Sequence, residues 1–515
     1  MLSYCRSAAL YGINAYDVQI EFDLGGGLPA IVIVGLPDEA VRESKDRVRS
    51  ALNNSGFDFP EKRITINLAP ADTKKEGPAF DLPIALGILA AMNVVPLDVL
   101  SAYTIVGELS LDGCVRSVKG ILPIATDIFS RGQTKLIIPK DNANEAGVVK
   151  GLQVYPVGSL SECVAFLKNE HIIAPFEVDV EHLFAHGLNG EMLDFSEVRG
   201  QQHVKRAIEI AVAGGHNVLM IGPPGSGKTM LAKRIASIIP RMTLEESLTV
   251  SKIHSIISNL SKESNGIITI RPFRSPHHTS SNTGLIGGGS EIKPGEVSLA
   301  HNGVLFLDEF PEFRRDVLEV LREPLEEGCV TITRAAGSIT YPANFMLVAA
   351  MNPCPCGHLT DPKKECVCSP VQIHRYRNKI SGPLLDRIDI HVEVPAIQYQ
   401  EFKSKQSAEP SINIRSRVET ARQIQRERFK NEHAHNFFVN ADMGSRHLRK
   451  FCETDEESES LLKAAFDELH ISARAHDRIL KVARTIADLE SCKKLEVSHI
   501  AEAIRLRALD RSNLR

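Results

Sequence analysis

A glycine-rich stretch at residues 217–236, NVLMIGPPGSGKTMLAKRIA, carries residue types that bind phosphate. An apolar strand pattern precedes the glycines and a helical pattern follows, which is the context of a phosphate-binding loop. Glycines let backbone amides point at the β- and γ-phosphates, and the next helix presents its positive N-terminal end. We expect Lys228 to neutralise phosphate charge and the Thr229 hydroxyl to bind Mg²⁺. The loop itself comprises Gly222, Pro223, Pro224, Gly225, Ser226 and Gly227.

A second motif, GVLFLDEF, lies about 80 residues after the predicted phosphate loop. Its apolar residues predict a buried strand, which Asp308 and Glu309 follow directly. Asp308 is the expected second partner of Mg²⁺, and Glu309 would polarise the water that attacks the γ-phosphate. An Asp-Glu pair after a strand is common on its own, but its place after this loop predicts a site for ATP and Mg²⁺.

Four of the ten cysteines lie within one polar segment, NPCPCGHLTDPKKECVCSP. Two Cys-x-Cys pairs, Cys354 with Cys356 and Cys366 with Cys368, are separated by a turn-rich loop. Four thiolates can surround Zn²⁺ tetrahedrally, and four ligands leave no open position, so such a zinc would be structural. Free thiols or a redox-sensitive cluster are the alternatives.

Basic residues between the two nucleotide motifs, and one in a segment after the second motif, suggest how the protein could bind a polymer. A flexible tip is expected at 287–289, and the segment TITRAAGSITYP predicts a hairpin. Basic side chains on such insertions could follow phosphates without reading sequence. Internal hydrogen bonding or contacts between subunits are the alternative roles. The residues concerned are Arg271, Arg274, His277, His278, Lys293 and Arg334.

Strand and helix patterns divide the chain into four parts. Residues 1–168 alternate strands and helices. Two buried strands are predicted, AIVIVGLP and KLIIPK. Two helices are predicted as well: an amphipathic one, DEAVRESKDRVRSALNNSG, and a buried one, FDLPIALGILAAMN. Residues 169–192 are predicted as a connector and 193–395 as a second strand–helix alternation. Residues 396–515 are mostly helical, with apolar periodicity that predicts three helices. The fold class is therefore α/β.

Size and composition fit a multidomain globular protein. The 515 residues suggest about three domains of roughly 150 residues. The net charge of −4 comes from 60 basic and 64 acidic residues, so contact with nucleic acid must depend on local basic patches. The longest apolar stretch, LPIALGILAAM, is shorter than the roughly 18 residues of a membrane span. Without an evident secretory signal, we expect the reducing cytoplasm.

Two segments, GQQHVKRAIEIAVAGGHNVLMIGPPGSGKT and LAHNGVLFLDEFPEF, are similar to signatures of the magnesium-chelatase-like AAA+ ATPases. The resemblance extends over almost the whole chain, and the nearest match is the ComM/YifB family. It implies a Lon protease-like, ChlI-type α+β domain at 1–168 and a linker at 169–192. It further implies an AAA+ core at 193–395, with a parallel sheet between helices, and a helical lid at 396–515.

The same resemblance implies further site residues. LVAAMNP matches a sensor-1 strand, so Asn352 would orient the attacking water. SGPLLDRIDIHVEVP matches the segment with the arginine finger, which implies Arg387. ISARAHDRILKVARTIADL matches a sensor-2 helix, with Arg474 preferred over Arg478. A lone arginine is also compatible with a surface salt bridge. A finger supplied to the neighbouring subunit implies a closed head-to-tail ring, and the family implies a hexamer.

The N-terminal segment TKKEGPAFDLPIALGIL resembles the serine-bearing segment of a Lon-type protease. In this chain the serine position is Ala79 and the lysine position is Leu122, so the resemblance implies a domain without proteolysis. Lys119, expected one helical turn earlier, has no nucleophile to activate. Lys74 and Lys75, with arginines of the first helix, could form a DNA-facing patch, although interleaved acids favour a mixed solvated face.

These observations predict an ATP-driven ring motor. By resemblance it would act on single-stranded or branched DNA, as a helicase or branch-migration factor in recombination or natural transformation. Two alternatives stay open at this point. One is a magnesium-chelatase-type or chaperone ATPase that remodels a protein partner. The other is a nucleotide-gated DNA-binding scaffold that does not translocate.

Overall fold

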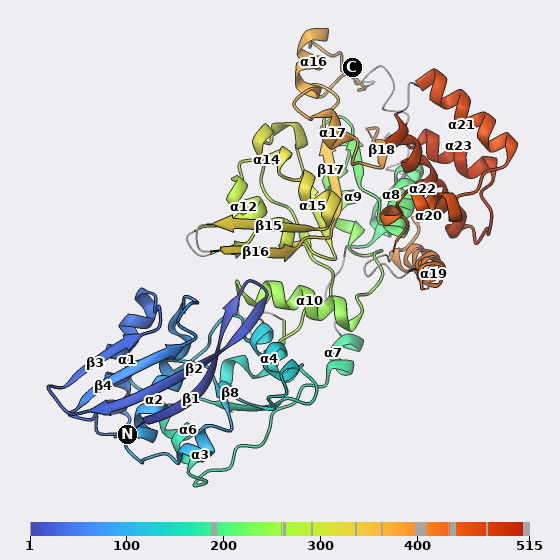
Figure 1. Ribbon diagram of the computed structural model, residues 1–515. Coiled ribbons are helices and arrows are strands. Elements are labelled where there is room, and N and C mark those ends of the chain that lie inside the picture. The colour runs from blue at the N-terminus through green and yellow to red at the C-terminus, as the bar shows by residue number, and fades with distance from the viewer. Residues whose placement is uncertain are drawn as a thin grey trace. The chain divides into compact units, whose positions relative to one another are not determined.

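The computed structural model describes residues 2–186, 193–258, 260, 264–289, 292–334, 337–361, 364–396, 408–430, 432, 439–469 and 472–507. They form two compact units (Figure 1). The predicted connector at 169–192 lies partly outside the described residues. The first unit comprises Met1–Gly187, Thr243–Thr269 and Thr333–Tyr341, and the second Leu188–Met242, Ile270–Ile332 and Pro342–Arg515.

A seven-stranded mixed sheet, in the order β3-β4-β2-β1-β5-β8-β9, forms the centre of the first unit. β2 pairs antiparallel with β1 and β4, and the other neighbours are parallel. KLIIPK is confirmed as a buried strand, β8. AIVIVGLP forms β3, but the prediction that it is buried was wrong, because β3 is an edge strand with no fully buried residue. The strands are β1 (Leu2–Tyr11), β2 (Asn14–Gly25), β3 (Ala30–Val34), β4 (Arg63–Ala69), β5 (Thr104–Ile105), β8 (Lys135–Pro139) and β9 (Gln153–Val157).

Both helices predicted in the first unit are confirmed. α1 (Glu39–Asn54) begins after Asp38, whose side chain accepts a 2.7 Å hydrogen bond from the Val41 backbone. α2 (Asp81–Ala91) is buried along its whole length. Beside the large sheet is a small antiparallel pair of strands. The remaining elements are α3 (Leu97–Leu100), β6 (Glu108–Leu109), β7 (Val115–Arg116), α4 (Ile121–Ser130), α5 (Ala143–Gly147), α6 (Leu160–Leu167) and α7 (Val180–His186).

A segment from the ATPase-like half of the sequence packs into the first unit. α10 (Leu244–Ser255) begins with a capping box between Thr243 and Glu246 and lies against α4. The Gly120 amide, just before α4, donates to the Ser255 carbonyl at 2.9 Å. The Ser255 hydroxyl donates to the buried carboxylate of Glu145. The sheet and this segment therefore share one unit although they are distant in sequence.

The second unit contains a five-stranded parallel sheet in the order β11-β14-β17-β10-β18. β10, β14 and β17 are buried throughout, as expected of a parallel sheet covered by helices. These strands are β10 (Val218–Ile221), β11 (Phe273–Arg274), β14 (Val304–Leu307), β17 (Met346–Met351) and β18 (Ile390–Glu393). Its helices are α8 (Gln202–Gly214), α9 (Lys228–Ile235), α12 (Asn282–Ile286), α13 (Glu296–Leu299), α14 (Arg315–Glu319), α15 (Arg322–Glu327), α16 (Pro370–Arg377) and α17 (Gly382–Leu385).

Two two-stranded ladders are separate from both large sheets. β12 (Gly287–Gly288) pairs with β13 (Lys293–Pro294) at the predicted glycine tip. β15 (Cys329–Arg334) pairs with β16 (Gly337–Pro342), which confirms the predicted hairpin strands. The turn between them, at 335–336, lies outside the described residues. Of the helices the structure describes, none is both long and apolar enough to cross a membrane.

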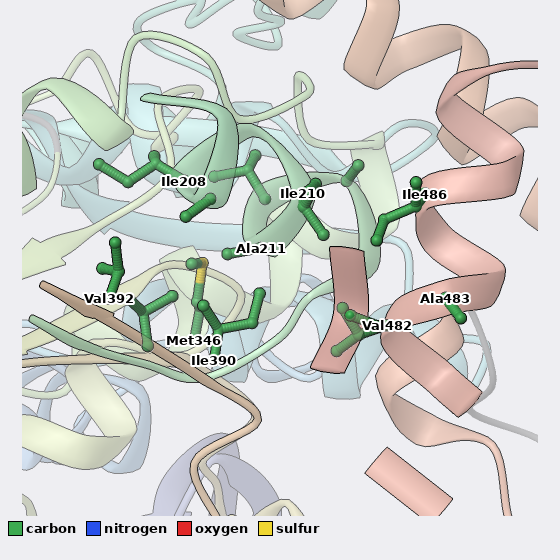
Figure 2. Packing of buried hydrophobic residues seen from close by; sticks show 14 of the residues in the cluster. Ile208, Ile210, Ala211, Met346, Ile390, Val392, Val482, Ala483 and Ile486 are labelled. Carbon is green, nitrogen blue, oxygen red and sulfur yellow. The ribbon is translucent and has the colours of Figure 1, made fainter. Parts of the chain in front are cut away.

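The C-terminal helices share one apolar core with the parallel sheet. Figure 2 shows Ile208 of α8 on the side of Val392 of β18, and Ile210 of α8 beside Ile486 of the C-terminal helix α22 (Ala473–Leu489). The three helices predicted in this region are confirmed as α19, α21 and α22. α19 and α22 pack against α8, which ties the helical region to the strand–loop–helix that carries the phosphate loop. The helices are α19 (Ser411–Phe429), α20 (Ser445–Phe451), α21 (Glu456–Leu469), α22 (Ala473–Leu489) and α23 (Val497–Arg505).

Candidate nucleotide-binding site

The glycine-rich loop connects buried β10 to the first turn of α9, as the sequence predicts. Gly225 and Gly227 have φ angles of +75° and +90°, a region in which a side chain would be strained. A Cβ at Gly222 would lie 2.1 Å from the Val394 carbonyl oxygen. The loop therefore needs glycine both for its turn and for its close packing on Val394, the residue that follows β18. It leads directly into the N-terminus of α9, where unpaired amides favour anions.

Lys228 is held at the loop by the loop's own backbone. Its ammonium donates to the carbonyls of Gly222 and Pro223 at 2.8 and 3.0 Å, and to the Asn352 side-chain oxygen at 3.3 Å. Burial lowers the pKa of Lys228, while the nearby Asp308 carboxylate favours its charged form. The lysine and the predicted sensor asparagine thus lie in direct contact.

Thr229 and Asp308 come together although they are distant in sequence. The Thr229 hydroxyl donates to an Asp308 carboxylate oxygen at 2.6 Å. A hydroxyl and a carboxylate are the oxygen ligands that Mg²⁺ takes beside nucleotide phosphates. The donor set therefore fits Mg²⁺, with these two side chains as its protein ligands.

Glu309 follows β14 in a left-handed backbone conformation, with φ of +51°. Non-glycine residues in this conformation carry strain and cluster at functional sites. Its amide donates to Asp308 at 2.9 Å, and its carboxylate lies 3.1 Å from the Nδ1 atom of His278. Sequence reasoning placed His278 among residues that follow a polymer, and it missed this pairing, for which the sequence carries no local signal.

Asn352 reaches the site because β17 lies beside β10. The register pairs Ile221 with Met351, and the Gly222 amide donates to the Met351 carbonyl at 3.2 Å. Asn352 follows at the end of β17, as Asp308 does at the end of β14. The predicted residues therefore converge at the carboxyl ends of adjacent parallel strands, where open α/β sheets bind ligands.

The predicted arginines gather in a different place. A cavity of about 270 Å³ is lined by Arg387, Arg474 and Arg478 together with residues of α15, α20 and α22. The described residues that line it include neither the phosphate loop nor Asp308 and Glu309. Arg387 is buried and pairs with Glu326 of α15. Burial lowers the pKa of Arg387, and the charges of the neighbouring arginines add to the effect.

Arg474 and Arg478 differ in their surroundings. Arg478 forms an ion pair with the buried Asp389, whose pKa is held low by this arginine despite the opposing effect of burial. Arg474 is exposed and makes no hydrogen bond or ion pair with the part of the chain that the structure describes. Arg478 thus has a structural partner, whereas Arg474 is available to an external anion.

The four clustered cysteines are brought together with their ligand atoms within 4.8 Å of one another. The Cys354 sulfur lies 3.4 Å from that of Cys356 and 3.6 Å from that of Cys366. Tetrahedral zinc with Zn–S bonds of about 2.3 Å needs sulfurs about 3.8 Å apart, so the donor set fits Zn²⁺. A hydrogen bond from the His358 amide lowers the pKa of Cys356 to about 6, which favours the thiolate that a metal binds.

Comparison with known proteins agrees with this geometry. Models for "Magnesium chelatase, subunit ChlI", "Subunit ChlI of Mg-chelatase" and "Magnesium chelatase, subunit ChlI C-terminal" match residues 194–402, 20–142 and 408–507. The chain is 44% identical over 512 residues to "Competence protein ComM" of Haemophilus influenzae, covering 99% of this chain and 98% of that protein. The chain belongs to the ComM/YifB family of magnesium-chelatase-like AAA+ proteins. YifB of Escherichia coli is also 44% identical, over 513 residues and the same shares.

More distant likenesses of this ComM/YifB family member cover parts of the chain. A "DNA replication licensing factor MCM6" of Oryza sativa subsp. indica is 25% identical over 327 residues, 55% of this chain and 36% of that protein. "Lon protease 2" of Bacillus subtilis is 25% identical over 174 residues, 30% of this chain and 31% of that protein. Membership of the AAA+ family indicates ATPase activity.

The basic residues between the motifs are partly committed to internal contacts. Arg271 donates to the carbonyls of Pro240 and Asn302 at 2.7 Å each, and Arg274 forms a two-pronged pair with Glu296 at 2.7 Å. These two arginines thus have the internal role that sequence analysis gave as an alternative. His277 hydrogen-bonds Thr279 at 2.8 Å. Lys293 is exposed beside the glycine tip, and Arg334, which follows the second motif, is exposed at the hairpin end.

Two lysines of the N-terminal region lie elsewhere than sequence analysis placed them. Lys75 is fully buried, so it cannot belong to a DNA-facing patch, whereas Lys74 is exposed and pairs with Glu76 at 2.8 Å. Lys119 was expected one helical turn before Leu122. In the structure it is exposed and precedes α4, because the helix begins only at Ile121.

Proposed function

We propose that this protein is an ATP-hydrolysing ring motor that acts on DNA. The observation that carries the proposal is the convergence of the phosphate loop, Thr229, Asp308, Glu309 and Asn352 at adjacent strand ends. This set contains a phosphate cradle, oxygen ligands for Mg²⁺ and a carboxylate for the attacking water. These are the parts that phosphoryl transfer to water requires.

Each side chain has a distinct role in this proposal. Amides of the loop and the Lys228 ammonium bind the β- and γ-phosphates, while Thr229 and Asp308 hold Mg²⁺. Mg²⁺ neutralises charge that develops on the phosphates. Glu309 accepts a proton from the attacking water, and Asn352 orients that water at the γ-phosphate. His278 positions the Glu309 carboxylate through their 3.1 Å contact.

We assign the two remaining arginines to a neighbouring copy of the chain. Arg387 and Arg474 line a cavity that does not include the phosphate loop. In a head-to-tail assembly this face would meet the neighbour's nucleotide, where the arginines stabilise transition-state charge. We propose that this assembly closes into a ring, with the hexamer that the family resemblance implies as its expected form.

The name of a relative, "Competence protein ComM", and the likeness to a replication licensing factor support DNA as the polymer. We therefore propose helicase or branch-migration activity on single-stranded or branched DNA in the cytoplasm. We further propose that residues 1–168 do not cut peptides, because the serine and lysine positions hold Ala79 and Leu122. Zinc in the four-cysteine cluster completes the proposed set of bound ions.

The test is the ATPase rate of the full chain with single-stranded, duplex and four-way-junction DNA. The motor predicts that at least one DNA form raises turnover and that strands separate or the junction moves. Turnover that rises without strand movement would favour a nucleotide-gated scaffold. Turnover that no DNA raises would contradict a DNA motor and favour remodelling of a protein partner.

A further inference from the structure

The four cysteines frame a loop that begins and ends beside the nucleotide site. Cys354 follows Asn352 by two residues, directly after β17. Cys368 precedes Ser369, which caps the N-terminus of α16 in a capping box with Gln372. One metal bound by both pairs would therefore fix the sensor asparagine to the start of α16.

The metal loop contacts the phosphate loop at Gly357. This residue has φ of +82°, and a Cβ added to it would lie 2.6 Å from Cδ of Pro224. The same Cβ would be 3.9 Å from the Asn352 side chain. The backbone at Gly357 thus lies directly against the phosphate loop and within van der Waals distance of the sensor residue.

α16 returns to the same place from its other end. The Arg377 guanidinium donates to the Pro353 carbonyl at 3.2 Å, and the buried Tyr376 hydroxyl is hydrogen-bonded to the Asn352 backbone. Asn352 is therefore contacted on one side by Lys228 and on the other by the helix that the cysteine loop leads into.

We propose that Zn²⁺ bound by Cys354, Cys356, Cys366 and Cys368 sets the position of Asn352 and Pro224 and thereby controls nucleotide affinity and hydrolysis. The inference rests on the proposed function, because it requires the phosphate loop to bind ATP. The zinc takes no part in the reaction, since its four ligands leave no position for a nucleotide or water. Its effect passes through Gly357, which contacts Pro224, and through α16, which contacts Asn352. Residues around a site commonly orient the groups that bind its ligand in this way.

The first test measures metal and nucleotide separately. Purified full-length protein should contain about one zinc per chain, and Cys366→Ser should lose most of it. The same variant should bind a fluorescent ATP analogue about tenfold more weakly. Cys114→Ser, which alters an exposed cysteine of the first unit, is the matched control and should change neither. Less than about a tenth of an equivalent of zinc, or iron in its place, would overturn the metal assignment.

Loss of zinc could unfold the loop, so a second test uses two glycine variants that leave the cysteines unchanged. They test whether the cysteine loop controls the nucleotide site. Gly357→Ala should retain zinc but lower the ATPase rate about 100-fold, because the added Cβ displaces Pro224 in the phosphate loop. Gly132→Ala has nearly the same φ, +81°, with nothing within 4 Å of the added Cβ, and should retain both zinc and ATPase activity. Normal nucleotide affinity and turnover in Gly357→Ala and Cys366→Ser would overturn the coupling. A wild-type chain that holds zinc but binds no ATP would instead refute the proposed function.

Discussion

Each unit of the molecule buries a lysine close to a glycine–proline turn, and the two lysines have different surroundings. In the first unit, the Lys75 ammonium donates to the carbonyls of Pro70 and Thr73, the latter at 2.7 Å. In the second, Lys228 donates to loop carbonyls and also contacts Asn352, with Asp308 nearby. Burial lowers the pKa of both lysines. A buried lysine alone therefore does not identify a chemical site; the convergence of other polar groups does.

The two positions that match the Lon serine and lysine also lack converging polar groups, because apolar side chains surround them. Leu122 is fully buried and clusters with Val148 and Ile267, the last of which follows α10 in the chain. Ala79 packs against another apolar cluster. Apolar side chains from the ATPase-like half of the sequence thus fill the surroundings of one former dyad position. The first unit therefore binds the segment around Ile267 at Leu122.

The largest expected effect is on nucleotide binding. Lys228→Ala should weaken ATP affinity about 100-fold, because a charged donor to the phosphates is lost. Lys75→Ala should leave ATP affinity unchanged and lower the free energy of unfolding by about 1–3 kcal/mol, since buried carbonyls lose their donor. Titration with a fluorescent ATP analogue and chemical denaturation measure both quantities. Equal ATP affinities of the two variants would contradict the comparison.

Hydrolysis should separate from binding at Glu309. Glu309→Gln should retain ATP but slow its hydrolysis by about 100-fold or more, because the carboxylate that accepts the water proton is gone. His278→Ala should cause a smaller loss in turnover with ATP affinity preserved, since the histidine only positions this carboxylate. Single-turnover hydrolysis and equilibrium binding distinguish the two steps. Weaker ATP binding in either variant would assign these residues to binding.

A smaller, pH-dependent effect is expected in the first unit. Burial raises the pKa of Glu145 from 4.5 to about 7, against the hydrogen bond from Ser255. Between these values the folded chain keeps a proton that the unfolded chain has lost, so stability should fall as pH rises from about 5 to 7. Burial also raises the pKa of Asp81 to about 6, and this carboxyl acts in the same direction.

Glu145→Gln should therefore reduce the fall in melting temperature between pH 5 and pH 7, without abolishing it, because Asp81 remains. The exposed Glu39→Gln variant is the control and should follow the wild type. Identical pH profiles for wild type and Glu145→Gln would show that the buried carboxyl does not titrate in this range.

Sequence reasoning placed correctly those elements that a continuous segment specifies. The phosphate loop, Asp308 and Glu309 lie at strand–loop junctions whose apolar pattern is local. It failed where a contact joins separate segments, as between His278 and Glu309 or between Gly357 and Pro224. The burial of Lys75 was missed for the same reason, because backbone carbonyls that bind it carry no sequence signal.

The account depends most on a nucleotide site that two copies of the chain complete together, and a mixing experiment tests this directly. Arg387→Ala and Glu309→Gln should each be nearly inactive in ATP hydrolysis. Random mixing gives about a quarter of interfaces with an intact Glu309 facing an intact Arg387, so activity should reappear. Lys228→Ala mixed with Glu309→Gln is the control and should stay inactive, because each subunit's own site is damaged. No recovery in the Arg387→Ala mixture would contradict the proposal.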